Sequence, residues 1–154
     1  MCSGGTVANI TALWAARNLA FPPEGNFKGV SHDGLFRALK YYGYDGAAVV
    51  VSKRGHYSFR KTADILGIGR DYLVAVDTDD DNRIDLEALR ETCTRLKKEN
   101  ICIISVIGIA GTTETDNIDP LEEIAEIARE FKAHFHVDAA WGGPTLFSRS
   151  YKSL

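Results

Sequence analysis

Four short segments of this 154-residue chain combine residue types that can bind or react with a ligand. The first is Ser3-Gly4-Gly5-Thr6, which lies directly before a stretch with helical spacing. Glycine lets the backbone approach an anion closely, and the first turn of a helix offers free N–H groups and the positive end of its dipole. Gly4, Gly5 and Thr6 are therefore candidate phosphate ligands, with a plain turn and cap as the alternative.

His56 and Asp138 lie in two further segments, each close behind a run of apolar residues. A histidine ring at such a position can stack on an aromatic ligand or move protons, and an ordinary loop residue is the alternative. A carboxylate at the end of an apolar strand must be paired, or its pKa rises. A cationic ligand group, such as a protonated pyridine nitrogen, would keep Asp138 ionised, and capping of the next turn is the alternative.

Thr112 and Thr113 form the fourth segment, where they follow Gly111 at the end of the longest apolar run. Their hydroxyl groups can face a ligand. The alternative is that they end a strand by bonding to the local backbone, as threonine hydroxyls commonly do.

An acidic stretch imitates the start of a calcium-binding loop with Asp77, Asp79 and Asp81. The sixth position of the loop is Asn82 where the sharp turn needs glycine, and the twelfth is Ala88 where calcium needs a bidentate glutamate. The pattern therefore favours a solvated acidic loop.

A second metal-like pattern is formed by His134, His136 and Asp138, which alternate along one predicted strand and so share a face. A zinc hydrolase would use such a set, although it needs further ligands, and only His32 and His56 remain among the histidines. A zinc hydrolase stays open as an alternative function.

Composition narrows the possible classes of protein. Eighteen Lys+Arg against 21 Asp+Glu give a net charge of −3, which argues against a nucleic-acid partner. No apolar run approaches the roughly 18–20 residues that span a bilayer, so no membrane segment is expected. Three widely spaced cysteines form no disulfide framework and suit a reducing, cytoplasmic location.

Hydrophobic periodicity predicts helices that alternate with short apolar strands. The helices are expected from near Val7 onwards and over about 33–42, 57–66, 85–99 and 120–133, with Thr6, Asp85 and Asp119 as N-caps. The strands are expected over about 47–52, 72–76, 101–109 and 134–138. This alternation predicts one α/β domain with a mostly parallel sheet flanked by helices. Because ligands bind at the carboxyl edge of such sheets, the four segments should converge there.

The order and spacing of these segments resemble the group II pyridoxal-phosphate-dependent amino acid decarboxylases, which act on glutamate, aspartate, diaminobutyrate and aromatic amino acids. The resemblance covers essentially all 154 residues. It rests on Ser-Gly-Gly-Thr-x-Ala-Asn at 3–9, Gly-His at 55–56, Gly-Thr-Thr-Glu-Thr at 111–115 and His-Val-Asp-Ala-Ala-Trp-Gly-Gly at 136–143. It implies part of the large domain of a fold-type I pyridoxal-phosphate enzyme.

Residue roles follow from this resemblance. Gly4 and Gly5, with Thr6 nearby, would hold the cofactor phosphate, while His56 and Ala140 would pack against opposite faces of its pyridine ring.

The resemblance also assigns Asp138 and Thr113. Asp138 would pair with the ring nitrogen and Thr113 would help to orient the cofactor, while His56 would hold or protonate the reacting substrate. The ring acts as the electron sink when the α-carboxylate leaves as carbon dioxide.

One departure from the family concerns its cofactor-binding lysine, which follows a histidine downstream of the Asp-Ala-Ala segment. None of the eight lysines here follows a histidine. Residues 1–154 are therefore expected to be a partial large domain without its N-terminal part, the lysine segment or the C-terminal small domain, and to be inactive alone. The parent protein is expected to be a cytoplasmic homodimer that decarboxylates an acidic amino acid. An aminotransferase, a cysteine desulfurase and a non-catalytic scaffold remain alternatives.

Overall fold

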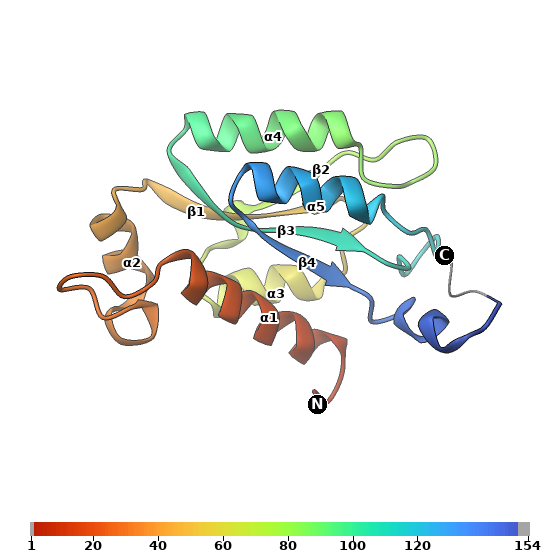
Figure 1. Ribbon diagram of the computed structural model, residues 1–154, viewed down its shortest axis with the longest axis horizontal. Coiled ribbons are helices and arrows are strands. Elements are labelled where there is room, and N and C mark those ends of the chain that lie inside the picture. Colours follow the sequence, from red (N-terminus) through yellow and green to blue (C-terminus); the bar gives the residue numbers. More distant parts are fainter. Residues whose placement is uncertain (1, 151–154) are drawn as a thin grey trace.

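Four apolar runs form a single parallel sheet in the computed structural model, which describes residues 2–150 (Figure 1). The strands are β1 (Gly46–Ser52), β2 (Leu73–Val76), β3 (Ile101–Ile109) and β4 (His134–Asp138), in the order β2-β1-β3-β4. All three strand pairs are parallel. β1 and β3 are almost completely buried, as expected for central strands covered on both faces. The predicted α/β class with a parallel sheet is confirmed.

Helices cover both faces of this sheet. The helices are α1 (Gly5–Ala20), α2 (Val30–Tyr42), α3 (Ser58–Ile65), α4 (Leu86–Lys98) and α5 (Leu121–Glu130), with 3-10 turns η1 (Arg70–Tyr72) and η2 (Gly143–Phe147). α1 and α3 lie on one face and α4 and α5 on the other (Figure 1). Within residues 2–150, no helix combines the length and apolar character that crossing a membrane requires.

The sheet separates two hydrophobic cores, and a bulge in β3 changes which residues of the strand face each core. Ala48 pairs with Ile103 while the next residue, Val49, pairs with Ser105, so that Ile104 is the extra residue. Ile104 and Val106, two positions apart, consequently pack into opposite cores. The bulge thus shifts the alternation of the strand by one position, so that Ile103 before it and Val106 after it face the same core.

Of the expected N-caps Asp85 and Thr6, only Asp85 caps its helix. Asp85 caps α4 as expected, because its Oδ1 accepts hydrogen bonds from two backbone N–H groups of the first turn at 2.8 and 3.0 Å. Thr6 is not an N-cap: α1 already begins at Gly5, and no side chain caps it. Two other helices differ from their expected ranges of about 33–42 and 120–133. α2 begins at Val30, and α5 ends at Glu130, shortly before Lys132 adopts a left-handed backbone conformation.

Asp119 does not cap α5, so that prediction was wrong. Its carboxylate instead accepts the backbone N–H groups of Ile84 and Ile109, each at 2.8 Å, and thereby joins the loop before α4 to the end of β3. The side chain is buried, and this burial raises the pKa of Asp119 while the two N–H donors lower it in part. A carboxylate with two acceptor oxygens suits this position, because both facing groups are donors.

We therefore expect Asp119→Asn to destabilise the fold by about 1–3 kcal/mol, because the amide can accept from only one of the two buried N–H groups. Urea denaturation of the native protein measures the change. Asp80→Asn, at an exposed position of the nearby loop, is the matched control and should leave the unfolding midpoint unchanged. Equal midpoints for the two variants would contradict the assigned role of Asp119.

Candidate active site

The carboxyl ends of β1, β3 and β4 and the start of α1 surround a cavity of about 370 Å³. The chain moves from β1 to β2 on one side and returns to β3 on the other side of β1, so the order of the sheet reverses between β1 and β3. Ligands of open α/β sheets bind at such a reversal. The residues that line the cavity are Gly5, Thr6, Asn9, Arg54, His56, Tyr57, Ile109, Gly111, Thr112, Thr113, Asp138, Ala140 and Trp141. All four predicted segments thus contribute to one site.

The first turn of α1 forms one wall of the cavity. Gly5 and Thr6 line it, whereas Gly4 lines an adjoining hollow. A Cβ atom on Gly5 would lie 2.8 Å from the Cβ of Ala140, so only glycine allows the helix start to approach the turn after β4 this closely. Because no side chain caps α1, the free N–H groups of its first turn suit an anionic ligand.

Asp138 closes the cavity at the end of β4 and is only 7% exposed. Its Oδ2 accepts a hydrogen bond from Asn9 Nδ2 at 3.0 Å, and its Oδ1 accepts the backbone N–H of Ala140 at 3.2 Å. None of the ion pairs within residues 2–150 involves this carboxylate. A buried carboxylate with hydrogen-bond donors and no protein cation suits a cationic ligand group.

His56 lies half-buried in the loop after β1, with its ring centroid 4.1 Å from that of Tyr57. Its Nδ1 lies 2.8 Å from Ser58 Oγ and accepts the backbone N–H of Ser58 at 3.2 Å. These contacts fix the orientation of the ring at the wall of the cavity.

The two threonines after β3 differ in environment. Thr112 is buried, and its Oγ1 accepts the backbone N–H of Thr115 at 3.3 Å, as expected if it bonds to the local backbone. The same oxygen lies 2.6 Å from Thr115 Oγ1. Thr113 is exposed and lines the cavity.

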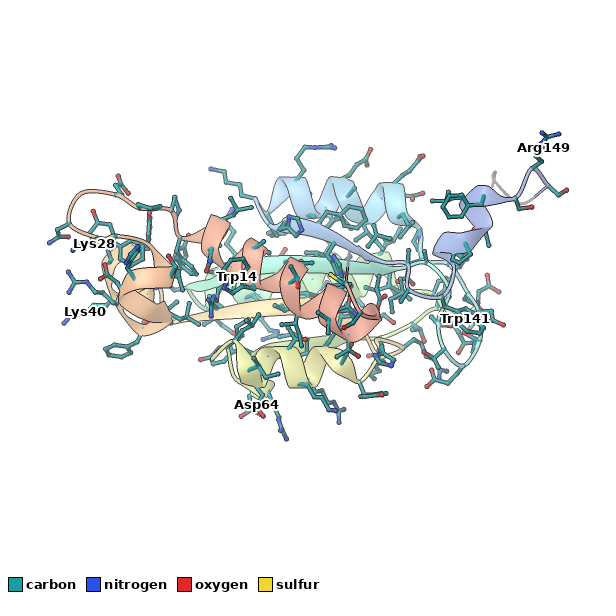
Figure 2. All side chains as sticks on the ribbon, turned by 90° about the horizontal axis from the view of Figure 1, so that it is seen from below. Trp14, Lys28, Lys40, Asp64, Trp141 and Arg149 are labelled. Carbon is teal, nitrogen blue, oxygen red and sulfur yellow. The ribbon has the colours of Figure 1, made fainter. Side chains whose placement is uncertain are left out.

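The turn after β4 is fastened to the end of β3. The Gly142 N–H donates to Ala110 O at 3.0 Å, and a Cβ atom on Gly142 would lie only 2.3 Å from that oxygen. The same turn carries Trp141, which is exposed beyond the carboxyl edge of the sheet, at the far end of the molecule from Lys28 and Lys40 (Figure 2).

Asn9 and Arg54 are among the lining residues to which the sequence analysis gave no role. Asn9 shares the buried face of α1 with Leu13 and Ala16. A polar amide at helical spacing from two apolar residues was the sequence signal that could have identified it. Arg54 is the one arginine or lysine among the described residues of the cavity lining. Its guanidinium donates to Asn82 Oδ1 in the loop between β2 and α4.

The residues of the alternative zinc site do not gather as a set of metal ligands. His134 is exposed, while His136 Nε2 lies 2.9 Å from Asn9 Oδ1. Across residues 2–150, no three His, Cys, Asp or Glu side chains gather as metal ligands. Burial lowers the pKa of His136, an effect that Asp138 opposes and His134 reinforces.

Comparison with known proteins identifies similar sequences and structures. A family model described as "Pyridoxal-dependent decarboxylase conserved domain" matches residues 1–154. An aspartate 1-decarboxylase of Aliivibrio fischeri is 54% identical over 153 residues, which cover 99% of this chain and 28% of that protein. An L-2,4-diaminobutyrate decarboxylase of Acinetobacter baumannii is 31% identical and is covered to 30%.

Two solved structures are also similar to this chain. Mouse CSAD superimposes with a TM-score of 0.86 at 32% identity, covering 99% of this chain and 29% of that one. The glutamate decarboxylase domain of a diaminobutyrate-pyruvate transaminase and L-2,4-diaminobutyrate decarboxylase from Vibrio parahaemolyticus gives 0.87 at 32% identity, covering 99% and 32%. The chain thus spans less than a third of the length of each of these relatives.

The lowered pKa of His136 predicts a pH-dependent stability. Below pH 6.5, the usual pKa of histidine, His136 binds a proton more readily in the unfolded chain than in the folded one. The contribution of neutral His136 to the unfolding free energy is therefore complete above pH 6.5 and is lost as the pH falls towards the lowered pKa of the folded state. Between about pH 7.5 and 5.5 the native protein should lose up to about 1 kcal/mol more unfolding free energy than His136→Gln. His32→Gln, at an exposed position, should behave like wild type in the same urea titrations. Identical pH slopes for wild type and His136→Gln would refute this account.

Proposed function

Because this chain belongs to the pyridoxal-dependent decarboxylase family, we propose that the protein carrying it decarboxylates an acidic amino acid with pyridoxal 5′-phosphate as cofactor. The observation that carries the proposal is Asp138, a buried carboxylate without a protein cation among the described residues, at the wall of a cavity that also includes an uncapped helix start.

The residues of the cavity fit this cofactor at both of its charged ends. The phosphate suits the free N–H groups at the start of α1, where we assign Gly4, Gly5 and the Thr6 hydroxyl as its ligands. The pyridine nitrogen carries a proton when it faces a carboxylate, which is the role we assign to Asp138. The start of α1 and Asp138 line the same cavity, whose volume of about 370 Å³ is in the range of small-molecule sites.

The remaining residues would hold the flat ring and the substrate. His56 would pack on one face of the ring and Ala140 on the other, and Thr113 would orient the cofactor from the loop after β3. When bound, the cofactor supplies an electron sink for the bond to the departing carboxylate. Asp138 would keep the proton on the ring nitrogen, and His56 would hold or deliver a proton on the substrate side.

Arg54 supports an acidic substrate. Its guanidinium is the permanent positive charge on the described lining of the cavity, and it would attract the side-chain carboxylate of aspartate or glutamate. The same charge would repel the second ammonium group of 2,4-diaminobutyrate. The 54% identity to a protein named aspartate 1-decarboxylase points in the same direction.

The rest of the assignment concerns the whole protein. We propose that the chain is part of a cofactor-binding large domain, since it spans 28% of its aspartate 1-decarboxylase relative. The lysine that binds the cofactor covalently would then come from outside these residues, the 154 residues alone would lack activity, and the native protein would be a cytoplasmic homodimer.

The proposal is tested on the purified native protein. Bound pyridoxal phosphate should give visible absorbance, and carbon dioxide should be released from aspartate or glutamate without an added keto acid. Turnover that requires a keto acid acceptor would indicate an aminotransferase, and release of sulfur from cysteine a desulfurase. A protein that neither binds the cofactor nor releases carbon dioxide would overturn the proposal.

Asp138→Asn should reduce kcat on the order of a hundredfold, because the neutral amide loses a charge-assisted contact of about 2–3 kcal/mol. Steady-state decarboxylation and cofactor titration measure the effect. Asp71→Asn, at an exposed position of η1, should retain wild-type values. An unimpaired Asp138→Asn enzyme would remove this carboxylate from the mechanism.

Arg54→Gln should raise the KM for the acidic substrate by about tenfold, which corresponds to the loss of one charged hydrogen bond of about 1.5 kcal/mol, with a smaller change in kcat. Lys53→Gln changes the neighbouring exposed cation, which pairs with Asp77, and should leave the KM unchanged. Equal KM values for the two variants would mean that Arg54 does not select the substrate.

A further inference from the structure

A single buried amide connects the carboxylate of the candidate site with its histidine. Asn9 is 3% exposed and contacts three polar side chains that come from distant parts of the sequence. Its Nδ2 donates to Asp138 Oδ2 at 3.0 Å and to Ser58 Oγ at 3.3 Å, and its Oδ1 lies 2.9 Å from His136 Nε2. Ser58 Oγ in turn lies 2.8 Å from His56 Nδ1.

The chemistry of these contacts fixes the direction of each hydrogen bond on the Asp138 side. An ionised carboxylate only accepts, so the NH₂ group of Asn9 must face Asp138 and its carbonyl oxygen must face His136. His136 therefore donates from Nε2 and carries its proton there. Burial lowers the pKa of His136, which agrees with a neutral ring that has one proton.

The contacts on the His56 side are fixed in the same way. The backbone N–H of Ser58 can only donate, and it points at His56 Nδ1 at 3.2 Å, so this nitrogen is an acceptor. The Ser58 hydroxyl accepts from Asn9 and can donate its own proton to the same nitrogen. The ring proton of neutral His56 then lies on Nε2.

We propose that Asn9 is a positioning residue: its amide holds Asp138 as a hydrogen-bond acceptor, fixes the His136 tautomer that donates from Nε2, and orients the Ser58 hydroxyl as a second donor to His56 Nδ1. The structural consequence stands on the contacts alone, whereas the catalytic consequence rests on the decarboxylase function proposed above. One side chain thereby contacts Asp138 directly and His56 through Ser58.

Packing alone would not require an amide at this position. The other buried residues of α1, Leu13 and Ala16, are apolar, and a buried amide costs free energy unless its polar atoms are paired. Asn9 uses both donors and one acceptor on site residues and their immediate partners. A completely paired buried network of this kind specifies one arrangement of its members.

The test compares variants in the native protein without cofactor by ¹⁵N NMR of labelled histidine rings. In wild type, His56 should show an unprotonated Nδ1 and a protonated Nε2. Asn9→Ala should convert His136 into a mixture of tautomers and shift the His56 Nδ1 resonance, while the Ser58 backbone N–H keeps the His56 proton on Nε2. Ser58→Ala should shift the His56 Nδ1 resonance alone, because it leaves the contact between Asn9 and His136 intact. Asn18→Ala, on the same helix away from the site, is the matched control and should change neither ring.

Kinetics of the cofactor-loaded protein provide the second measurement. Asn9→Ala should lower kcat by about tenfold with little change in KM, since it removes about one net hydrogen bond from each positioned group. Asn9→Asp should lower kcat further, because it places a second carboxylate against Asp138. The double variant Asn9→Ala/Ser58→Ala should lose less than the product of the single effects, because both act through one chain of contacts.

The outcomes separate this inference from the proposed function. An unchanged His136 tautomer and an unchanged His56 Nδ1 resonance in a folded Asn9→Ala protein would overturn the inference even if the protein is a decarboxylase. If Asn9→Ala does not fold, an unchanged His56 Nδ1 resonance in Ser58→Ala overturns it instead. The expected histidine changes in a protein without decarboxylase activity would support the positioning role and reject the function.

Discussion

The site depends on keeping one carboxylate buried at the end of a parallel strand, without an ion-pair partner within residues 2–150. Asp138 can lie there because the strand register pairs it with Ile109 and because Asn9 and the Ala140 N–H supply hydrogen-bond donors. Each donor comes from a different element, so α1 and the turn after β4 must both be in place. The fold thus holds a buried, hydrogen-bonded carboxylate in a position that suits a cationic ligand group.

The strands were the easiest elements to predict. β3 and β4 have the predicted limits, because a buried parallel strand is written into the sequence as an uninterrupted apolar run. The helix caps were less predictable. Asp85 acts locally and was identified, whereas Asp119 has the same local pattern but bonds to Ile84, 35 positions away. A local pattern does not reveal which distant N–H groups will lack a partner.

The candidate site, too, was predictable from the sequence only in part. The positions at the strand ends were predictable, because the carboxyl ends of parallel strands meet at one edge and the motifs follow those ends. The network around Asn9 was not, since its contacts join residues 49, 127 and 129 positions apart. Arg54 lies only two positions before His56, but the role of its charge could not be inferred until the lining of the cavity was known. The family resemblance found from the motifs is confirmed by the match over residues 1–154.

The close contact between Gly142 and Ala110 also limits how the cavity can change shape. The hydrogen bond between them, together with the absence of room for a Cβ atom, joins the turn after β4 to the loop after β3. These two walls are consequently joined to each other through the backbone. The loop after β1 has no such attachment to them among the described contacts, and His56 is connected to Asp138 through the side chains of Ser58 and Asn9. Two walls of the cavity are therefore held by the backbone itself, whereas the His56 wall is held to them by side-chain hydrogen bonds that a single substitution can remove.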